Sequence, residues 1–118
     1  MKKKIVICDD ELLILDVLSI ALENDSIEVI STSKSTELIA LIEIAQPDLL
    51  LIDLQMPWLT GDKIIRELKT AQQFDHIPII MMSASGRGER VAAECGADAF
   101  LAKPFELDDL YDLVEKVM

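Results

Sequence analysis

Four short stretches of this chain carry residues that could do chemistry, and each comes at the end of a hydrophobic run. They are Cys8-Asp9-Asp10-Glu11, Asp53-Leu54-Gln55-Met56-Pro57, Met82-Ser83-Ala84 and Lys103-Pro104-Phe105. Because the carboxyl ends of parallel strands meet at one edge of a sheet, where ligands bind, we expect the four stretches to form one site. Such a site combines carboxylates with a hydroxyl and an amine. This combination predicts phosphoryl chemistry on a carboxylate.

The elements that would position these stretches alternate between strands and helices. Short apolar runs predict strands at residues 5–8, 27–30, 49–52, 77–82 and 99–101. Helical spacing of apolar residues predicts helices over 12–22, 38–45, 87–95 and 107–117, and a further helix that begins at Gly61. Either Ser33 or Ser35 could cap the second helix. The alternation predicts an α/β fold, a doubly wound parallel sheet of five strands with five helices on its two faces.

Length and charge narrow the class of protein. The 118 residues fit a single domain, 1–118, and the net charge of -11 repels nucleic acid phosphates, so we expect no direct nucleic acid binding. No apolar run reaches the length of a membrane span. The two cysteines lack CxxC spacing, which indicates buried thiols in a reducing compartment. We therefore expect a cytoplasmic protein without a membrane segment.

Over essentially its whole length, the chain resembles the receiver domain of two-component response regulators, the chemotaxis regulators among them. The resemblance rests on motifs in a fixed order: Asp9-Asp10, the run from Asp53 to Pro57 with Gly61 after it, Ser83-Ala84, Gly96-Ala97-Asp98, and Phe100 shortly before Lys103-Pro104-Phe105. It implies the flavodoxin-like strand order 2-1-3-4-5. In that order, the strands that precede the four stretches are neighbours.

The resemblance also implies a chemistry for the acidic residues. Asp53 would be the phosphoacceptor, whose carboxylate attacks a phosphoryl group and forms an acyl phosphate. Asp10 and Asp53 would hold Mg²⁺ together with the backbone carbonyl of Gln55, while Asp9 would bind the ion through water. Hard oxygen ligands with positions left for water and phosphate are what magnesium prefers.

The remaining family residues would stabilise and report the phosphoryl group. Lys103 and Ser83 would each contact a phosphoryl oxygen, and Ser83 with Phe100 would form the switch. Phe100 lacks the hydroxyl of the tyrosine that the family often has there. The phosphoryl donor would be a histidine kinase or a histidine phosphotransfer protein, and the domain would assist its own phosphorylation and dephosphorylation without being an enzyme. A downstream protein would bind the surface of the fourth helix, fifth strand and fifth helix, and a phosphorylation-dependent dimer is compatible with the family.

Three other functions fit the sequence less well than a receiver domain does. A haloacid dehalogenase-type aspartyl-phosphate phosphatase would carry a second acid two residues after its nucleophile, where Gln55 stands. A phosphate-independent scaffold would lack some site residue, and none is missing here. A flavin-binding module would place hydroxyls after the first strand, where the acids of residues 9–11 would repel the flavin phosphate. Taken singly, those acids could also serve only to favour the start of the first helix.

Overall fold

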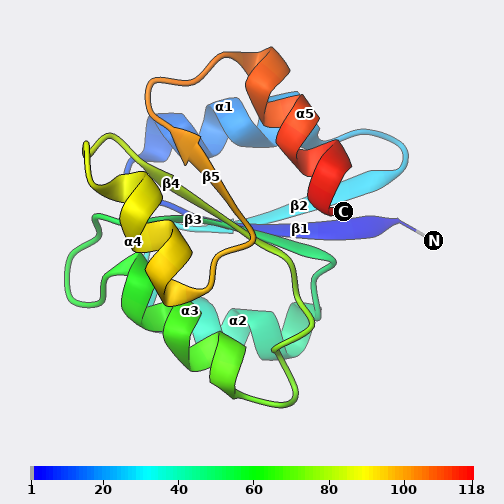
Figure 1. Ribbon diagram of the computed structural model, residues 1–118. Helices are drawn as coiled ribbons and strands as arrows, with labels where there is room; N and C mark the ends of the chain where they lie inside the picture. Colours follow the sequence, from blue (N-terminus) through cyan, green and yellow to red (C-terminus); the bar gives the residue numbers. More distant parts are fainter. Residues whose placement is uncertain (1) are drawn as a thin grey trace.

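The computed structural model describes residues 2–118 as a sheet with helices on both of its faces (Figure 1). The strands are β1 (Lys3–Cys8), β2 (Ile27–Thr32), β3 (Leu49–Asp53), β4 (Ile79–Ser83) and β5 (Ala99–Ala102). The helices are α1 (Leu12–Leu22), α2 (Leu38–Ala45), α3 (Gly61–Thr70), α4 (Gly88–Cys95) and α5 (Leu107–Val117), with a 3-10 turn η1 (Ser35–Glu37) before α2. No helix within this part of the chain is both long enough and apolar enough to cross a membrane.

The five strands are parallel and lie in the order β2-β1-β3-β4-β5. This is the doubly wound α/β arrangement that the sequence predicts, in the strand order 2-1-3-4-5 that the resemblance to the receiver family implies. Figure 1 shows α1 and α5 on one face of the sheet and α2, α3 and α4 on the other. Every residue of β3 and β4 is buried, as expected for central strands covered on both faces.

The buried side chains form two separate clusters, one on each face of the sheet. Alternate residues of β1, Val6 and Cys8, pack with α2, α3 and α4, whereas Ile5 and Ile7 pack with α1 and α5. The same alternation runs along β3, because successive side chains of a strand point to opposite faces. Each continuous apolar run in the sequence therefore contributes side chains to both buried clusters.

Two local expectations are wrong. The fourth strand begins at Ile79 rather than at residue 77, because Pro78 has no N–H to pair and only its carbonyl accepts a hydrogen bond, from Leu50. Neither Ser33 nor Ser35 caps the second helix. The η1 turn moves the start of α2 onward, and the Ser35 hydroxyl instead donates to the carbonyl of Pro57 at 2.9 Å.

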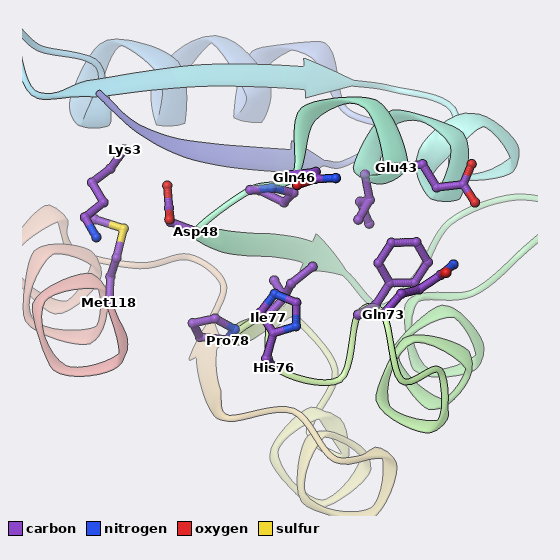
Figure 2. Close-up of a pocket in the computed structure, with 12 residues that line it drawn as sticks. Lys3, Glu43, Gln46, Asp48, Gln73, His76, Ile77, Pro78 and Met118 are labelled. Atoms are coloured by element: carbon purple, nitrogen blue, oxygen red, sulfur yellow. The ribbon is translucent and has the colours of Figure 1, made fainter. Parts of the chain in front are cut away.

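The register of the sheet brings the chemical residues to one edge. Cys8 pairs with Ile52, and Asp53 pairs with Met82, so β1, β3 and β4 end at nearly the same level. A cavity of about 510 Å³ lies at the opposite edge, where Asp48 and Pro78 precede β3 and β4 (Figure 2). None of the predicted site residues lines this cavity. It carries no part of the predicted chemistry.

Candidate functional site

Three carboxylates meet at the carboxyl edge of the sheet. Oxygen atoms of Asp9, Asp10 and Asp53 all lie within 4.8 Å of one another. Asp53 is the last residue of β3, and Asp9 follows β1 directly. Asp9 is 0% exposed and Asp53 is 3% exposed, whereas Asp10 is open to solvent. The predicted gathering of the acids is therefore present, with two of the three charges buried.

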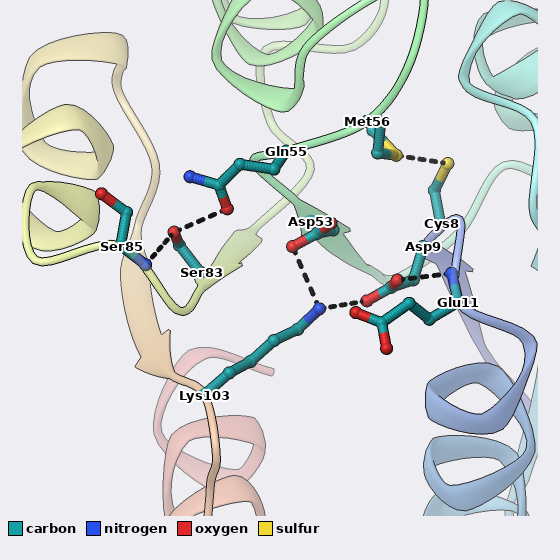
Figure 3. Close-up of polar contacts among 9 residues, drawn as sticks. All are labelled: Cys8, Asp9, Glu11, Asp53, Gln55, Met56, Ser83, Ser85 and Lys103. Carbon is teal, nitrogen blue, oxygen red and sulfur yellow. Dashed lines mark hydrogen bonds and ion pairs between the residues drawn. The ribbon is translucent and has the colours of Figure 1, made fainter.

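Lys103 supplies the positive charge that lies between the two buried carboxylates. Its ammonium group is 2.6 Å from Oδ2 of Asp9 and 3.1 Å from Oδ1 of Asp53 (Figure 3). The other oxygen of Asp9, Oδ1, accepts the backbone N–H of Glu11 at 2.9 Å. With three carboxylates against one ammonium, the cluster keeps an excess of two negative charges when all are ionised.

This imbalance changes how readily Asp53 ionises. Burial is the main cause that raises the pKa of Asp53 from 3.8 to about 6, and the charge of Asp9 adds to it, although Lys103 acts in the opposite direction. Burial alone would lower the pKa of Lys103, but its hydrogen bonds to Asp9 and Asp53 outweigh burial and raise it. The cationic form of Lys103 is therefore favoured, whereas the ionised form of Asp53 beside it is disfavoured.

The thiol beneath the acids is not part of their chemistry. Cys8 is fully buried, and its thiol contacts the sulfur of Met56 at 3.5 Å. Burial, followed by the charges of Asp9, Asp53 and Asp10, raises the pKa of Cys8 to about 12. Because the thiolate is the reactive form of cysteine, Cys8 is inert and fills the core, and Cys95 at the end of α4 is likewise a buried free cysteine.

Ser83 is at the site, but its hydroxyl is already engaged. The hydroxyl donates to the side-chain oxygen Oε1 of Gln55 at 2.9 Å and accepts the backbone N–H of Ser85 at 3.0 Å (Figure 3). The predicted hydroxyl donor is thus in place at the end of β4. Its partner is the side chain of Gln55, whereas the predicted magnesium site uses only the backbone carbonyl of that residue.

The donor set fits a divalent cation that prefers oxygen. Three carboxylates within reach of one another and an uncompensated negative charge are what a hard ion such as magnesium neutralises. At an effective dielectric near 20, two charges 4 Å apart repel by about 4 kcal/mol, so an empty cluster of this kind is unfavourable. Burial is the first cause of the raised pKa of Asp53, and the charge of Asp9 contributes to it as a second cause.

Phe100 lies beside Ser83 rather than beside the acids. The two residues are linked through Gly88, the first residue of α4, because a Cβ atom on Gly88 would lie 2.7 Å from ring atoms of Phe100 and 2.8 Å from Cβ of Ser83. The Phe100 ring, half-buried, therefore packs against the start of α4. Phe100 and Ser83 therefore lie against the same end of α4.

Sequence reasoning missed two residues that support the site. Ser35 ties the loop after β3 to η1 through the carbonyl of Pro57, and Gly88 permits the close approach of α4. A glycine at the start of a helix, where it lowers helix propensity, was a signal for Gly88. Ser35 gave no such signal, because its contact joins loops 22 residues apart in the sequence.

Comparison with known proteins agrees with this geometry. The family model of the response regulator receiver domain matches residues 5–115. The phosphate regulon transcriptional regulatory protein PhoB of Pseudomonas aeruginosa is 33% identical over 118 residues, which cover 98% of this chain and 52% of PhoB. The chain therefore spans about half the length of that relative.

Two further similarities extend over nearly the whole of both molecules. Sporulation initiation phosphotransferase F of Bacillus subtilis is 28% identical over 120 residues, covering 100% of this chain and 95% of that protein. Among solved structures, a putative response regulator from Chloroflexus aurantiacus has a TM-score of 0.93 at 26% identity, and the similarity covers 99% of this chain and 98% of that one.

Proposed function

Because the chain belongs to the response regulator receiver domain family, whose members are phosphorylation-activated signalling switches, we propose that Asp53 is the residue on which it is phosphorylated. The observation that carries this proposal is the position of Asp53. It is a buried carboxylate at a strand end, with Lys103 at 3.1 Å and two further acids within 4.8 Å. We propose that residues 1–118 act as one domain in this role.

Each neighbour of Asp53 has a part in the transfer. A carboxylate oxygen of Asp53 forms a bond to phosphorus, the bond between phosphorus and the donor breaks, and the donor keeps its electron pair. Lys103 already contacts Oδ1 of Asp53, so its charge is in place to offset the negative charge on the phosphoryl oxygens. Ser83 can donate its hydroxyl to another phosphoryl oxygen once that hydroxyl leaves Gln55.

We propose that Asp10, Asp53 and the backbone carbonyl of Gln55 hold Mg²⁺, with Asp9 contributing through water. Both oxygens of Asp9 are already hydrogen-bonded, to Lys103 and to the backbone of Glu11, which supports the indirect role. When bound, magnesium would neutralise the acids and the charge of the transferring group. The domain assists its own phosphorylation and dephosphorylation in this way, and it is not an enzyme that turns over a separate substrate.

The phosphoryl donor is a histidine kinase or a histidine phosphotransfer protein, and α1 offers a surface for it. Leu13, Val17 and Ile20 are 76%, 45% and 82% exposed, and their spacing places them on one side of α1. Exposed apolar patches mark sites of protein contact. Since α1 begins directly after the acids of the site, a donor bound there would reach Asp53.

The surface that binds the downstream protein differs from the surface that binds the phosphoryl donor. We propose that a downstream protein binds the surface of α4, β5 and α5, because Phe100 joins Ser83 to the start of α4. That surface could also support a dimer of the phosphorylated form. The net charge of -11 argues against direct contact with nucleic acid, and we propose a cytoplasmic location.

Intact mass spectrometry tests the assignment. Incubation with acetyl phosphate and Mg²⁺ should add one phosphoryl group to the wild-type chain and none to Asp53→Ala. Ile20→Glu is a matched control, because acetyl phosphate needs no docking surface and the variant should gain the same mass as wild type. Equal phosphorylation of Asp53→Ala would contradict the proposal.

A further inference from the structure

The single hydrogen of the Ser83 hydroxyl is already used in a hydrogen bond in this structure. A serine hydroxyl donates one hydrogen bond, and the hydrogen of Ser83 goes to Oε1 of Gln55 at 2.9 Å. On its acceptor side, the oxygen takes the backbone N–H of Ser85 at 3.0 Å. Ser83 is 1% exposed, so water does not compete for either bond.

The two uses of this hydroxyl are mutually exclusive. A phosphoryl oxygen on Asp53 needs the same hydrogen that Gln55 now accepts. The Ser85 amide fixes the oxygen from the other side, so the hydroxyl changes partners by rotating its hydrogen while the contact to Ser85 is kept or strained. Figure 3 shows the Gln55 amide turned toward Ser83, with its oxygen facing the hydroxyl.

We propose that Gln55 is a positioning residue that holds the Ser83 hydroxyl in its unphosphorylated orientation, so that phosphorylation must exchange this hydrogen bond for one to the phosphoryl group. The proposal rests on the proposed phosphorylation of Asp53. It assigns to the Gln55 side chain a role that is separate from the role proposed for its backbone carbonyl.

The burial of the two partners favours such an exchange. Gln55 is exposed, so water replaces Ser83 as the partner of its amide when the bond opens. Ser83 is buried, so its hydroxyl cannot stay without a partner, and the phosphoryl oxygen is the group that takes the hydrogen. The bond to Gln55 therefore competes with ligand binding, and its loss should tighten binding of a phosphoryl mimic roughly fivefold.

Beryllofluoride with Mg²⁺ is the probe, because it mimics the phosphoryl group on a carboxylate without a transfer step. Its dissociation constant is measured for wild type, Gln55→Leu, Ser83→Ala and the double variant. We expect Gln55→Leu to lower the dissociation constant roughly fivefold when Ser83 is present and to leave it unchanged in the Ser83→Ala background. Gln72→Leu, an exposed glutamine outside the site, is the matched control and should bind as wild type does.

A second readout follows the hydroxyl itself. The amide of Ser85 donates to the Ser83 oxygen, so its chemical shift reports the state of that oxygen. In Gln55→Leu without ligand, the Ser85 shift should lie closer to the value of the beryllofluoride-bound wild type. A purely structural role of Gln55 would not move the shift in that direction.

The outcomes separate this inference from the proposed function. If beryllofluoride fails to bind wild type, or binds Asp53→Ala equally well, the phosphoacceptor assignment is wrong. If wild type binds and Asp53→Ala does not, but Gln55→Leu gives the same change with and without Ser83, or weakens binding, Gln55 does not act through Ser83. Only tightening that depends on Ser83 supports the inference.

Discussion

At the scale of single residues, Asp53 is a carboxylate whose charge is opposed by its surroundings. Burial and the neighbouring Asp9 raise its pKa to about 6, from 3.8, and Lys103 offsets only part of this. The ionised form of Asp53 is poorly stabilised by its surroundings. It would therefore gain more than an ordinary carboxylate from a bound cation or from a bond to phosphorus. The buried charge of Asp53 should therefore lower the stability of the metal-free protein.

The stability of the metal-free protein should depend on pH through Asp53. The folded pKa is the higher one, so between about pH 4 and 6 the folded state binds more protons than the unfolded state, and this residue's penalty disappears as the pH falls. A shift of about two pKa units corresponds to about 3 kcal/mol at neutral pH. Asp53→Asn removes the charge, so at pH 7 in EDTA it should be more stable than wild type by up to about this amount.

Denaturant unfolding of both proteins from pH 4 to pH 8 measures this difference. The stability advantage of Asp53→Asn should be largest at pH 7 and above, and it should fall below about 1 kcal/mol near pH 4, where Asp53 is protonated in the folded state and partly protonated in the unfolded state. Titrating groups that do not interact with Asp53 cancel, because they are common to the two chains. A difference that stays constant over this range would show that Asp53 ionises normally.

At the scale of elements, the start of α4 is where the site contacts a helix. Gly88 brings this helix against Phe100 of β5 and Ser83 of β4 at distances that leave no room for a side chain. Gly86, two residues earlier, has open space instead, with nothing within 4 Å of a Cβ atom placed on it. The two glycines therefore form a matched pair.

Gly88→Ala should destabilise the fold even though alanine is the better helix former. The new methyl group would meet the Phe100 ring at 2.7 Å and Ser83 at 2.8 Å, which is overpacking with a cost of about 1–3 kcal/mol. Gly86→Ala should be neutral or slightly stabilising. Thermal unfolding distinguishes the two, and Gly88→Ala should destabilise the chain less in a Phe100→Ala background than in the wild type. Equal melting temperatures for the two glycine variants would rule out this contact.

The elements themselves were largely predictable, because apolar runs and helical spacing carry information within ten or so residues. The aliphatic run 49–52 predicted a strand buried on both faces, and the acids after the strands marked the site edge. The start of β4 and the role of Ser35 were not predictable in the same way. They depend on which carbonyl or N–H lies opposite in the folded chain, as Pro57 does for Ser35.

The bond between Ser83 and Gln55 illustrates the same limit within the site. Each residue was predicted to lie near Asp53, but their pairing joins the end of β4 to the loop after β3, 28 residues apart in the sequence. Whether two polar side chains bond to each other or to water depends on burial and on angles that spacing does not encode. Residue types and order predicted the membership of the site, whereas packing determined its internal connections.

At the scale of the whole molecule, Mg²⁺ should stabilise the fold. Any ligand that binds the folded state alone adds about 2.7 kcal/mol at a concentration one hundred times its dissociation constant. The melting temperature of the wild-type chain should therefore be higher in millimolar Mg²⁺ than in EDTA. The exposed Trp58, in the loop after Asp53, offers a fluorescence signal for the same titration.

Asp10→Ala is the control for this effect. Asp10 is the exposed member of the cluster, so its loss should abolish most of the Mg²⁺ response while the core stays intact. An equal rise in melting temperature for this variant would place the ion elsewhere on this acidic chain.

The two buried clusters of the described residues share no member, and the sheet lies between them. One cluster underlies α1, whose exposed stripe we assign to the phosphoryl donor, and the other contacts Phe100. Substitutions without shared contacts have nearly additive effects, so repacking one face leaves the other intact. After a gene duplication, the packing beneath α1 can therefore change without altering the contact between Phe100 and α4, whereas α5 would change with α1 because these two helices share a cluster.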